Sequence, residues 1–121
     1  MILDTFLAEN AKAFNGESFV IPAYIGVSTS AVSVLITDTS LAGERGTRFA
    51  ISNARSSNTI TSDAVRSGTQ ILVPAGETLT TAALFSAVTN GTMLTEVSIG
   101  SILQTTAFDI EFFSTLTWNR A

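Results

Sequence analysis

The spacing of side chains near the start of the chain predicts one amphipathic helix over residues 2–14. The residues at the positions of a single helix face are Leu3, Phe6, Leu7, Asn10, Ala11 and Phe14. Asn15 and Gly16 follow, and glycine often ends a helix by adopting a left-handed conformation. A helix of this length is marginal by itself. We therefore expect it either to cover an edge of the domain or to dock, as an arm, on a neighbouring subunit.

After Gly16 the chain has the pattern of short β-strands. β-Branched and aromatic residues gather in short runs that are separated by turn residues. The predicted strands are 19–27, 32–37, 47–54, 59–66, 70–73, 80–88 and 93–99. Residues 55–58 predict one hairpin turn, and Asn90-Gly91 predicts a second turn with positive φ at both residues. Pro22 marks an edge or a bulge in the first strand.

The final strand, residues 108–118, has the clearest alternation. One face carries Phe108, Ile110, Phe112, Ser114, Leu116 and Trp118. The opposite face carries polar residues and Phe113, which we expect to be exposed. These elements predict a mainly β fold, an antiparallel sandwich or barrel with one short N-terminal helix. We expect residues 1–18 to form the helical arm and residues 19–121 the β-sandwich domain.

The composition excludes much side-chain chemistry. Cysteine and histidine are absent, so the chain contains no disulfide, Cys/His zinc site or Ser-His-Asp triad. Charged residues make up 13% and the net charge is −4, which argues against nucleic acid as a partner. No apolar run is long enough for a membrane helix, and Asp4 and Glu9 interrupt any secretory signal. We expect no membrane partner and synthesis in a cytoplasm.

No motif in the chain predicts catalysis. Asp109 and Glu111 share a strand face but lack a calcium-type loop, and we interpret them as a solvated edge. The loop 43–46 lacks the spacing of a phosphate-binding motif and is interpreted as a turn. We therefore expect no enzyme activity, no cofactor and no metal. Low charge with high apolar content fits a surface buried against other subunits, although a hydroxyl-rich β-protein has the same composition.

One pair of charged residues predicts a structural contact. Glu44 and Arg48 flank a glycine turn, and Leu41 lies three residues before Glu44. An arginine fork on this carboxylate would lock the loop onto the sheet.

The segment around this pair resembles a pattern of small tail-fibre and tail-collar-like structural proteins of tailed bacteriophages. The matching residues are Tyr24-Ile25-Gly26-Val27-Ser28, a Ser/Thr-rich run, then Asp38-Thr39-Ser40-Leu41-Ala42-Gly43-Glu44 and Arg48. Further on, Ala82-Ala83-Leu84-Phe85 and Asn90-Gly91 stand where such proteins have an E-x-G-L-F strand and a glycine turn. The glutamate of that element is missing, and Ala83 replaces its glycine.

The resemblance implies a non-enzymatic virion protein made in the host cytoplasm. Its partners would be copies of itself, as a trimer or higher homo-oligomer, and neighbouring virion proteins of the tail, fibre, baseplate or neck. A capsid decoration (cement) protein and a carbohydrate- or receptor-binding module are the alternatives. The expected assembly residues are Leu3, Phe6, Leu7, Phe14 and Phe113. Phe113 would be the aromatic platform of a glycan site.

Overall fold

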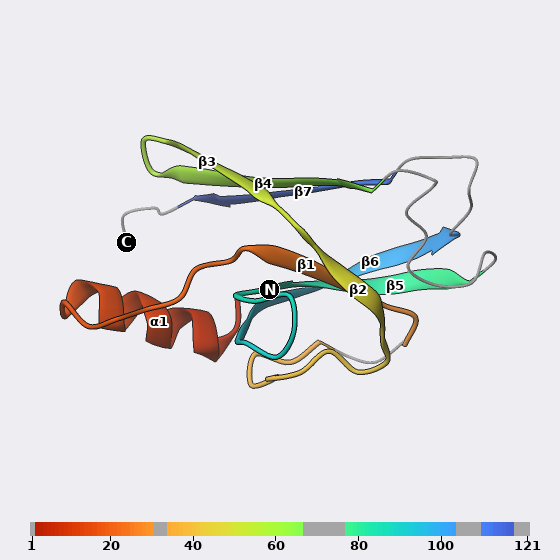
Figure 1. Ribbon diagram of the computed structural model, residues 1–121, viewed down its shortest axis with the longest axis horizontal. Coiled ribbons are helices and arrows are strands. Elements are labelled where there is room, and N and C mark those ends of the chain that lie inside the picture. The colour runs from red at the N-terminus through yellow and green to blue at the C-terminus, as the bar shows by residue number, and fades with distance from the viewer. Residues whose placement is uncertain (1, 31–33, 67–76, 104–109, 118–121) are drawn as a thin grey trace.

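The computed structural model describes residues 2–30, 34–66, 77–103 and 110–117, which form one helix and two antiparallel sheets. The helix is α1 (Asp4–Phe14). Sheet A has the order β2 (Glu44–Ala50), β1 (Tyr24–Ser28), β5 (Thr78–Phe85), β6 (Met93–Leu103). Sheet B has the order β3 (Ser52–Ser56), β4 (Thr59–Arg66), β7 (Ile110–Thr117). The sheets face each other as a sandwich (Figure 1), and the described strands do not close into a barrel. The predicted mainly β sandwich with a short N-terminal helix is confirmed.

Between β2 and β3 the chain passes from sheet A to sheet B through a single residue. Ile51 separates β2 from β3, and its N–H donates to the Ala23 carbonyl at 3.0 Å. Its half-buried side chain packs on the core between the sheets. The sequence predicted one strand over 47–54, which is wrong, because the chain leaves sheet A at Ile51 and begins sheet B at Ser52.

The main core lies between the two sheets. Its buried members are Ile25, Val27, Ala64, Leu79, Ala82 and Leu84. The Phe49 and Phe112 rings, one from each sheet, close it with centroids 5.8 Å apart. The alternation predicted for β7 is confirmed within 110–117: Ile110 and Phe112 pack on this core, whereas Phe113 is exposed.

A second, smaller core lies on the outer face of sheet A. Successive strand residues point to opposite faces, so Ala83 faces away from the core that contains Ala82. The cluster on this face comprises Leu3, Leu41, Ala83, Phe85 and Met93. It is therefore covered by the start of the N-terminal segment and by the loop that precedes β2.

Several predicted bounds are corrected by the structure. The first strand was predicted over 19–27, but β1 begins at Tyr24. Pro22 has no N–H to donate, and the Val20 N–H donates instead to a Glu9 carboxylate oxygen at 2.9 Å. The strand predicted over 32–37 is wrong for residues 34–37, because Asp38 accepts the Leu35 N–H at 3.0 Å and closes a turn. Residues 31–33 and the strand predicted over 70–73 lie outside the described residues.

The two predicted hairpins are present. Ser56 pairs with Thr59, so residues 57 and 58 form a two-residue loop between β3 and β4. β5 and β6 also pair, but residues 86–92 connect them, and β6 extends beyond the predicted end. Asn90 and Gly91 have φ of 54° and 69°, as their positive-φ turn requires.

We expect Leu79→Ala to lower the free energy of unfolding by about 2–5 kcal/mol. Leu79 is fully buried in the core between the sheets, so its truncation removes apolar contacts and leaves a cavity. Leu103→Ala is the matched control, because Leu103 is exposed at the end of β6, and it should change stability by less than about 0.5 kcal/mol. Urea unfolding of both variants measures the difference. Equal losses would contradict this assignment of the core.

Candidate functional site

The first turn of α1 is fixed to sheet A. The Leu3 N–H donates to the Leu94 carbonyl at 3.2 Å, and the Thr5 hydroxyl donates to the Met93 carbonyl. Leu3 and Phe6 are buried. The structure therefore places these two expected assembly residues in contacts within the chain, where the helix covers an edge of the domain.

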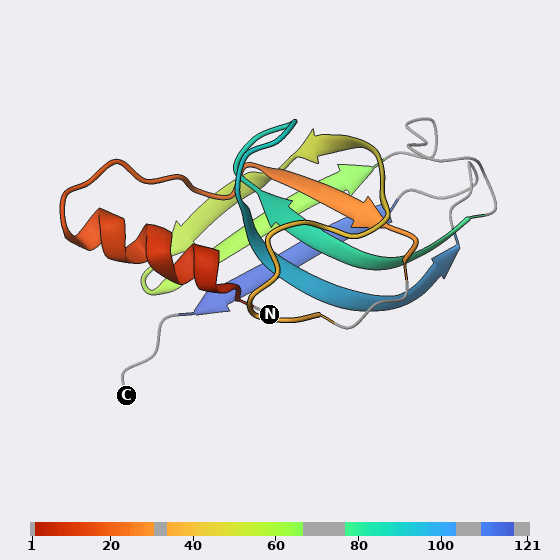
Figure 2. The same ribbon diagram turned by 90° about the horizontal axis from the view of Figure 1, so that it is seen from below.

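The other half of α1 projects beyond the ends of the sheets (Figures 1 and 2). Leu7 is 57% exposed and Phe14 is 95% exposed. The returning segment adds the exposed side chains of Phe19, Val20 and Ile21. We call these five residues the arm surface. Gly16, with φ of 74°, turns the chain back after the helix, as its position in the sequence predicted.

Polar contacts hold the returning segment close to α1 and sheet B. Glu9 accepts from Lys12 at 2.9 Å and from the Val20 N–H at 2.9 Å, and these bonds lower the pKa of its carboxyl. At the other end of the segment, Asn53 of β3 donates to the Pro22 carbonyl at 2.8 Å. The arm surface is thus displayed on a segment that is bonded at both ends.

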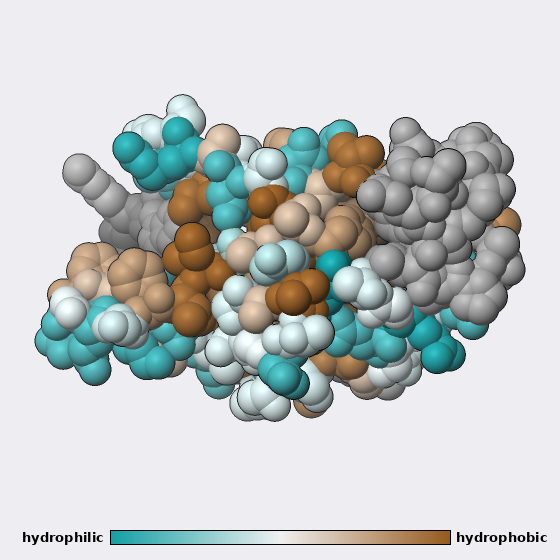
Figure 3. All heavy atoms as spheres, in the orientation of Figure 1, coloured by the Kyte–Doolittle hydropathy of each residue, from teal (hydrophilic) through white to brown (hydrophobic). Residues whose placement is uncertain are grey.

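An apolar cavity of about 620 Å³ lies where the arm meets the open end of the sandwich. Hydrophobic side chains gather beside α1 on this side of the molecule (Figure 3). The lining includes Phe6, Ile21, Val97 and Phe113, with hydroxyls such as that of Ser114. Phe113 is 63% exposed, as its place opposite the core residues of β7 predicted.

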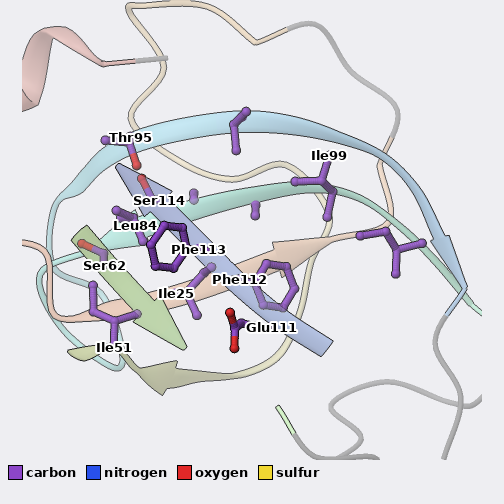
Figure 4. A pocket seen from close by; sticks show the side chains of 14 residues that line it. Ile25, Ile51, Ser62, Leu84, Thr95, Ile99, Glu111, Phe112, Phe113 and Ser114 are labelled. Carbon is purple, nitrogen blue, oxygen red and sulfur yellow. The ribbon is translucent and has the colours of Figure 1, made fainter. Parts of the chain in front are cut away.

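A second cavity of about 230 Å³ also lies between the sheets. Figure 4 shows side chains of both sheets around it, among them Ile25, Leu84 and Phe112. Its lining is mostly apolar, and Glu111 is the one ionisable residue among the described residues that line it. Glu111 is exposed, and its predicted neighbour Asp109 lies outside the described residues.

The predicted contact between Glu44 and Arg48 is present, and it is more extensive than the sequence indicated. Arg48 donates from Nε and Nη2 to the two Glu44 carboxylate oxygens at 2.7 and 3.0 Å. Its Nη1 donates to the carbonyls of Ala87 and Asn90 at 3.0 and 2.6 Å. The guanidinium carbon lies 3.4 Å from the Phe85 ring centroid. Arg48 thus fixes both β2 and the 86–92 loop, which is a structural role.

Two neighbours complete this loop lock. Leu41, the third predicted member, is buried in the cluster on the outer face of sheet A. Gly26 lies beneath the ion pair, because a Cβ added there would meet Glu44 Oε2 at 2.6 Å and the Phe85 ring at 2.9 Å. Sequence reasoning quoted Gly26 as part of a motif and did not assign it this function.

A buried carboxyl group on β6 was not singled out from the sequence. Glu96 is 1% exposed. Burial raises the pKa of Glu96 to about 7, and the hydrogen bond with Asp38 raises it in the same direction. The same bond, together with the Leu35 N–H, lowers the pKa of Asp38. The sequence signal that could have identified Glu96 is its position in the predicted strand 93–99, whose other residues are apolar or carry hydroxyls.

Across 2–30, 34–66, 77–103 and 110–117, no three acidic side chains come together in a group that could hold a metal ion. The turn predicted over 43–46 is wrong for residues 44–46, which belong to β2; the turn lies at residues 42–43, where Gly43 has φ of 67°. None of the helices in these ranges combines the length and the apolar character needed to cross a membrane.

Comparisons with known protein families, with curated proteins and with solved structures found no match to this chain.

We expect Arg48→Lys to lower the free energy of unfolding by about 2 kcal/mol, because lysine cannot reproduce the two-pronged bond to Glu44 or all the bonds to the loop carbonyls. Arg45→Lys is the control: Arg45 is half exposed and lies 3.5 Å from Glu77, so its change should cost less than about 0.5 kcal/mol. Chemical denaturation measures both. If the two variants lose the same stability, the loop lock is not a stabilising contact.

Proposed function

We propose that this chain is a non-enzymatic structural protein of a tailed-phage virion, acting as a β-sandwich module in a symmetric assembly. It would be made in the host cytoplasm and placed in the tail, fibre, baseplate or neck. A capsid decoration protein is the alternative position in the virion. Its partners are copies of itself, as a trimer or higher homo-oligomer, and neighbouring virion proteins.

The observation that carries the proposal is the arm surface. It displays five large apolar side chains, and one of them, Phe14, is almost fully exposed. Large apolar side chains exposed together on one part of a protein are typical of sites that another protein covers. Because α1 is anchored through Leu3 and Phe6, the displayed half is held in a defined orientation, which lowers the entropic cost of docking.

Some of the residues behind the phage resemblance also lie close together in the structure. Gly26 of β1, Glu44 and Arg48 pack against each other, and Leu41 anchors the intervening loop. This supports a structural function for the segment and leaves the virion assignment as our proposal.

We expect the double variant Leu7→Ser/Phe14→Ser to shift the purified protein from an oligomer to a monomer, since it removes apolar surface that only a partner would bury. Sedimentation velocity and native mass measurement report the state, and circular dichroism checks the fold. Deleting the whole helix is a poorer test, because it also removes Leu3 and Phe6 from the packed region.

The control is Leu103→Ser, which changes an exposed leucine outside the arm surface and should leave the oligomer intact. A wild-type protein that is monomeric, or a double variant that assembles like the wild type, would contradict self-assembly through the arm.

A carbohydrate- or receptor-binding module is the second candidate function. Phe113 favours it, because this ring is exposed and Phe113 is among the residues that line the larger cavity. Sugars stack on exposed aromatic faces and bond to neighbouring hydroxyls.

A glycan array tests this candidate directly. We expect binding, if this is the function, to fall at least about tenfold in Phe113→Ala, a loss of the size that one aromatic contact supplies. Val65→Ala, which also changes an exposed apolar residue of sheet B, is the control and should bind as the wild type does. An array without any bound glycan would reject the module.

A further inference from the structure

Glu96 lies in the layer between sheet A and its cover. It pairs with Ala83 across β5 and β6, and Ala83 belongs to the outer cluster with Leu3 and Leu41. Paired residues of adjacent strands point to the same face. The Glu96 carboxyl is therefore buried on the face that the 34–42 loop and the start of α1 cover.

A chain of hydrogen bonds runs from this carboxyl to the helix. Glu96 bonds to Asp38. Asp38 accepts the Leu35 N–H at 3.0 Å and donates its own N–H to the Leu35 carbonyl at 3.0 Å. The next carbonyl, that of Ile36, accepts the Asp4 N–H at 2.9 Å. The Asp38–Glu96 pair thus fixes the turn at residues 35–38. This turn, through the Ile36 carbonyl, fixes the start of α1.

Two carboxyl groups in direct contact need a shared proton. With a proton on Glu96, the pair is one hydrogen bond with one negative charge. Without that proton, a second negative charge lies on the buried Glu96 carboxyl beside the half-buried Asp38. The amino group of the first residue opposes the raised pKa of Glu96, although burial and Asp38 outweigh it. Asp4, the acidic residue of the first turn of α1, is exposed.

The positively charged side chains of α1 and β2 lie beside carboxylates other than Asp38 and Glu96. Lys12 bonds to Glu9, and Arg48 bonds to Glu44. Arg45 lies beside Glu77.

We propose that Asp38 and Glu96 form a proton-dependent latch, which holds the 34–42 loop and the first turn of α1 on sheet A and loosens as the pH rises through neutrality. The direction follows from the Glu96 carboxyl, whose pKa is raised from 4.5 to about 7 on folding. Its contribution is complete below about pH 4.5 and is lost as the pH rises to about 7. The pKa of Asp38 is lowered on folding, so its contribution to the stability of the latch is present above its usual pKa. That contribution is lost only in stronger acid. The latch is therefore tightest in mild acid.

Native-state hydrogen exchange tests the latch, with rates corrected for the intrinsic effect of pH. The Leu3 and Asp4 amides report the opening, because both donate across this contact. Between about pH 5 and about pH 8 we expect their opening constant to rise by tens of fold, as the shift in the Glu96 pKa requires. Amides of β4, which pair with β7 in sheet B, are the internal reference and should change much less. An equal change throughout the chain would overturn a local latch.

Glu96→Gln is the decisive variant, since the amide can donate to Asp38 but cannot lose a proton in this range. Its opening constant should be the same at both pH values. Glu17→Gln, which alters an exposed carboxylate that bonds only to Asn15 among the described contacts, should keep the wild-type response. A wild-type response in Glu96→Gln would reject the proposal.

A direct titration keeps the proposal testable if Glu96→Gln does not fold. Carboxyl-carbon NMR of the wild-type protein follows the ionisation of Glu96 itself. A midpoint near neutrality supports the latch, and a midpoint below about 5.5 overturns it. Neither measurement depends on the assembly state, so failure of the latch and failure of the proposed function are distinguishable.

Discussion

The arrangement of sheet A depends on how closely Arg48 approaches the strand beneath it. Gly26 leaves the space in which the Glu44 carboxylate and the Phe85 ring meet the arginine, with no room for a Cβ. In that position the guanidinium reaches the 86–92 loop as well. One side chain therefore joins β2, β5 and the β5–β6 connection, and the strand at the centre of these contacts must carry glycine.

The two faces of sheet A are stabilised by different forces. The inner face packs aliphatic and aromatic groups against sheet B, and this stabilisation depends little on charge. The outer face combines a small apolar cluster with the Arg48–Glu44 ion pair and the Asp38–Glu96 carboxyl pair. Small residues at positions 26 and 83 allow these polar groups to lie against the sheet. Salt and protons therefore act on the cover of sheet A and leave the sandwich core largely unchanged.

The sequence predicted best those features that depend on neighbouring residues. The helix, the strand over 59–66 and the alternation around Phe113 all follow from local spacing. The contact between Glu44 and Arg48 was also predicted, because the two residues are four positions apart in the sequence, on either side of Gly46. Local spacing determines which face of a helix or strand a side chain occupies, and the features that depend on this alone were predicted correctly.

The features that were missed depend on contacts between distant residues. The segment 19–23 has strand-forming residues, yet Glu9 takes the N–H that a sheet would need. Glu96 looks like one polar residue in a strand until Asp38 is placed beside it. The helix face was predicted as one surface, and only the edge of sheet A decides that Phe6 is covered while Phe14 is not.

The strand order has a consequence for how the chain folds. β1 pairs with β5, and β4 pairs with β7. In each sheet, therefore, one strand is synthesised well before the strand that pairs with it. Until then the β3–β4 hairpin presents an open edge, and such pairings between distant segments form slowly. The nascent chain is therefore exposed to wrong edge-to-edge pairing with other copies for most of its synthesis. The edge that waits for β7 is that of β4, whose sequence carries the hydroxyls of Thr59, Thr61 and Ser62 together with Asp63, and these residues make the open edge polar.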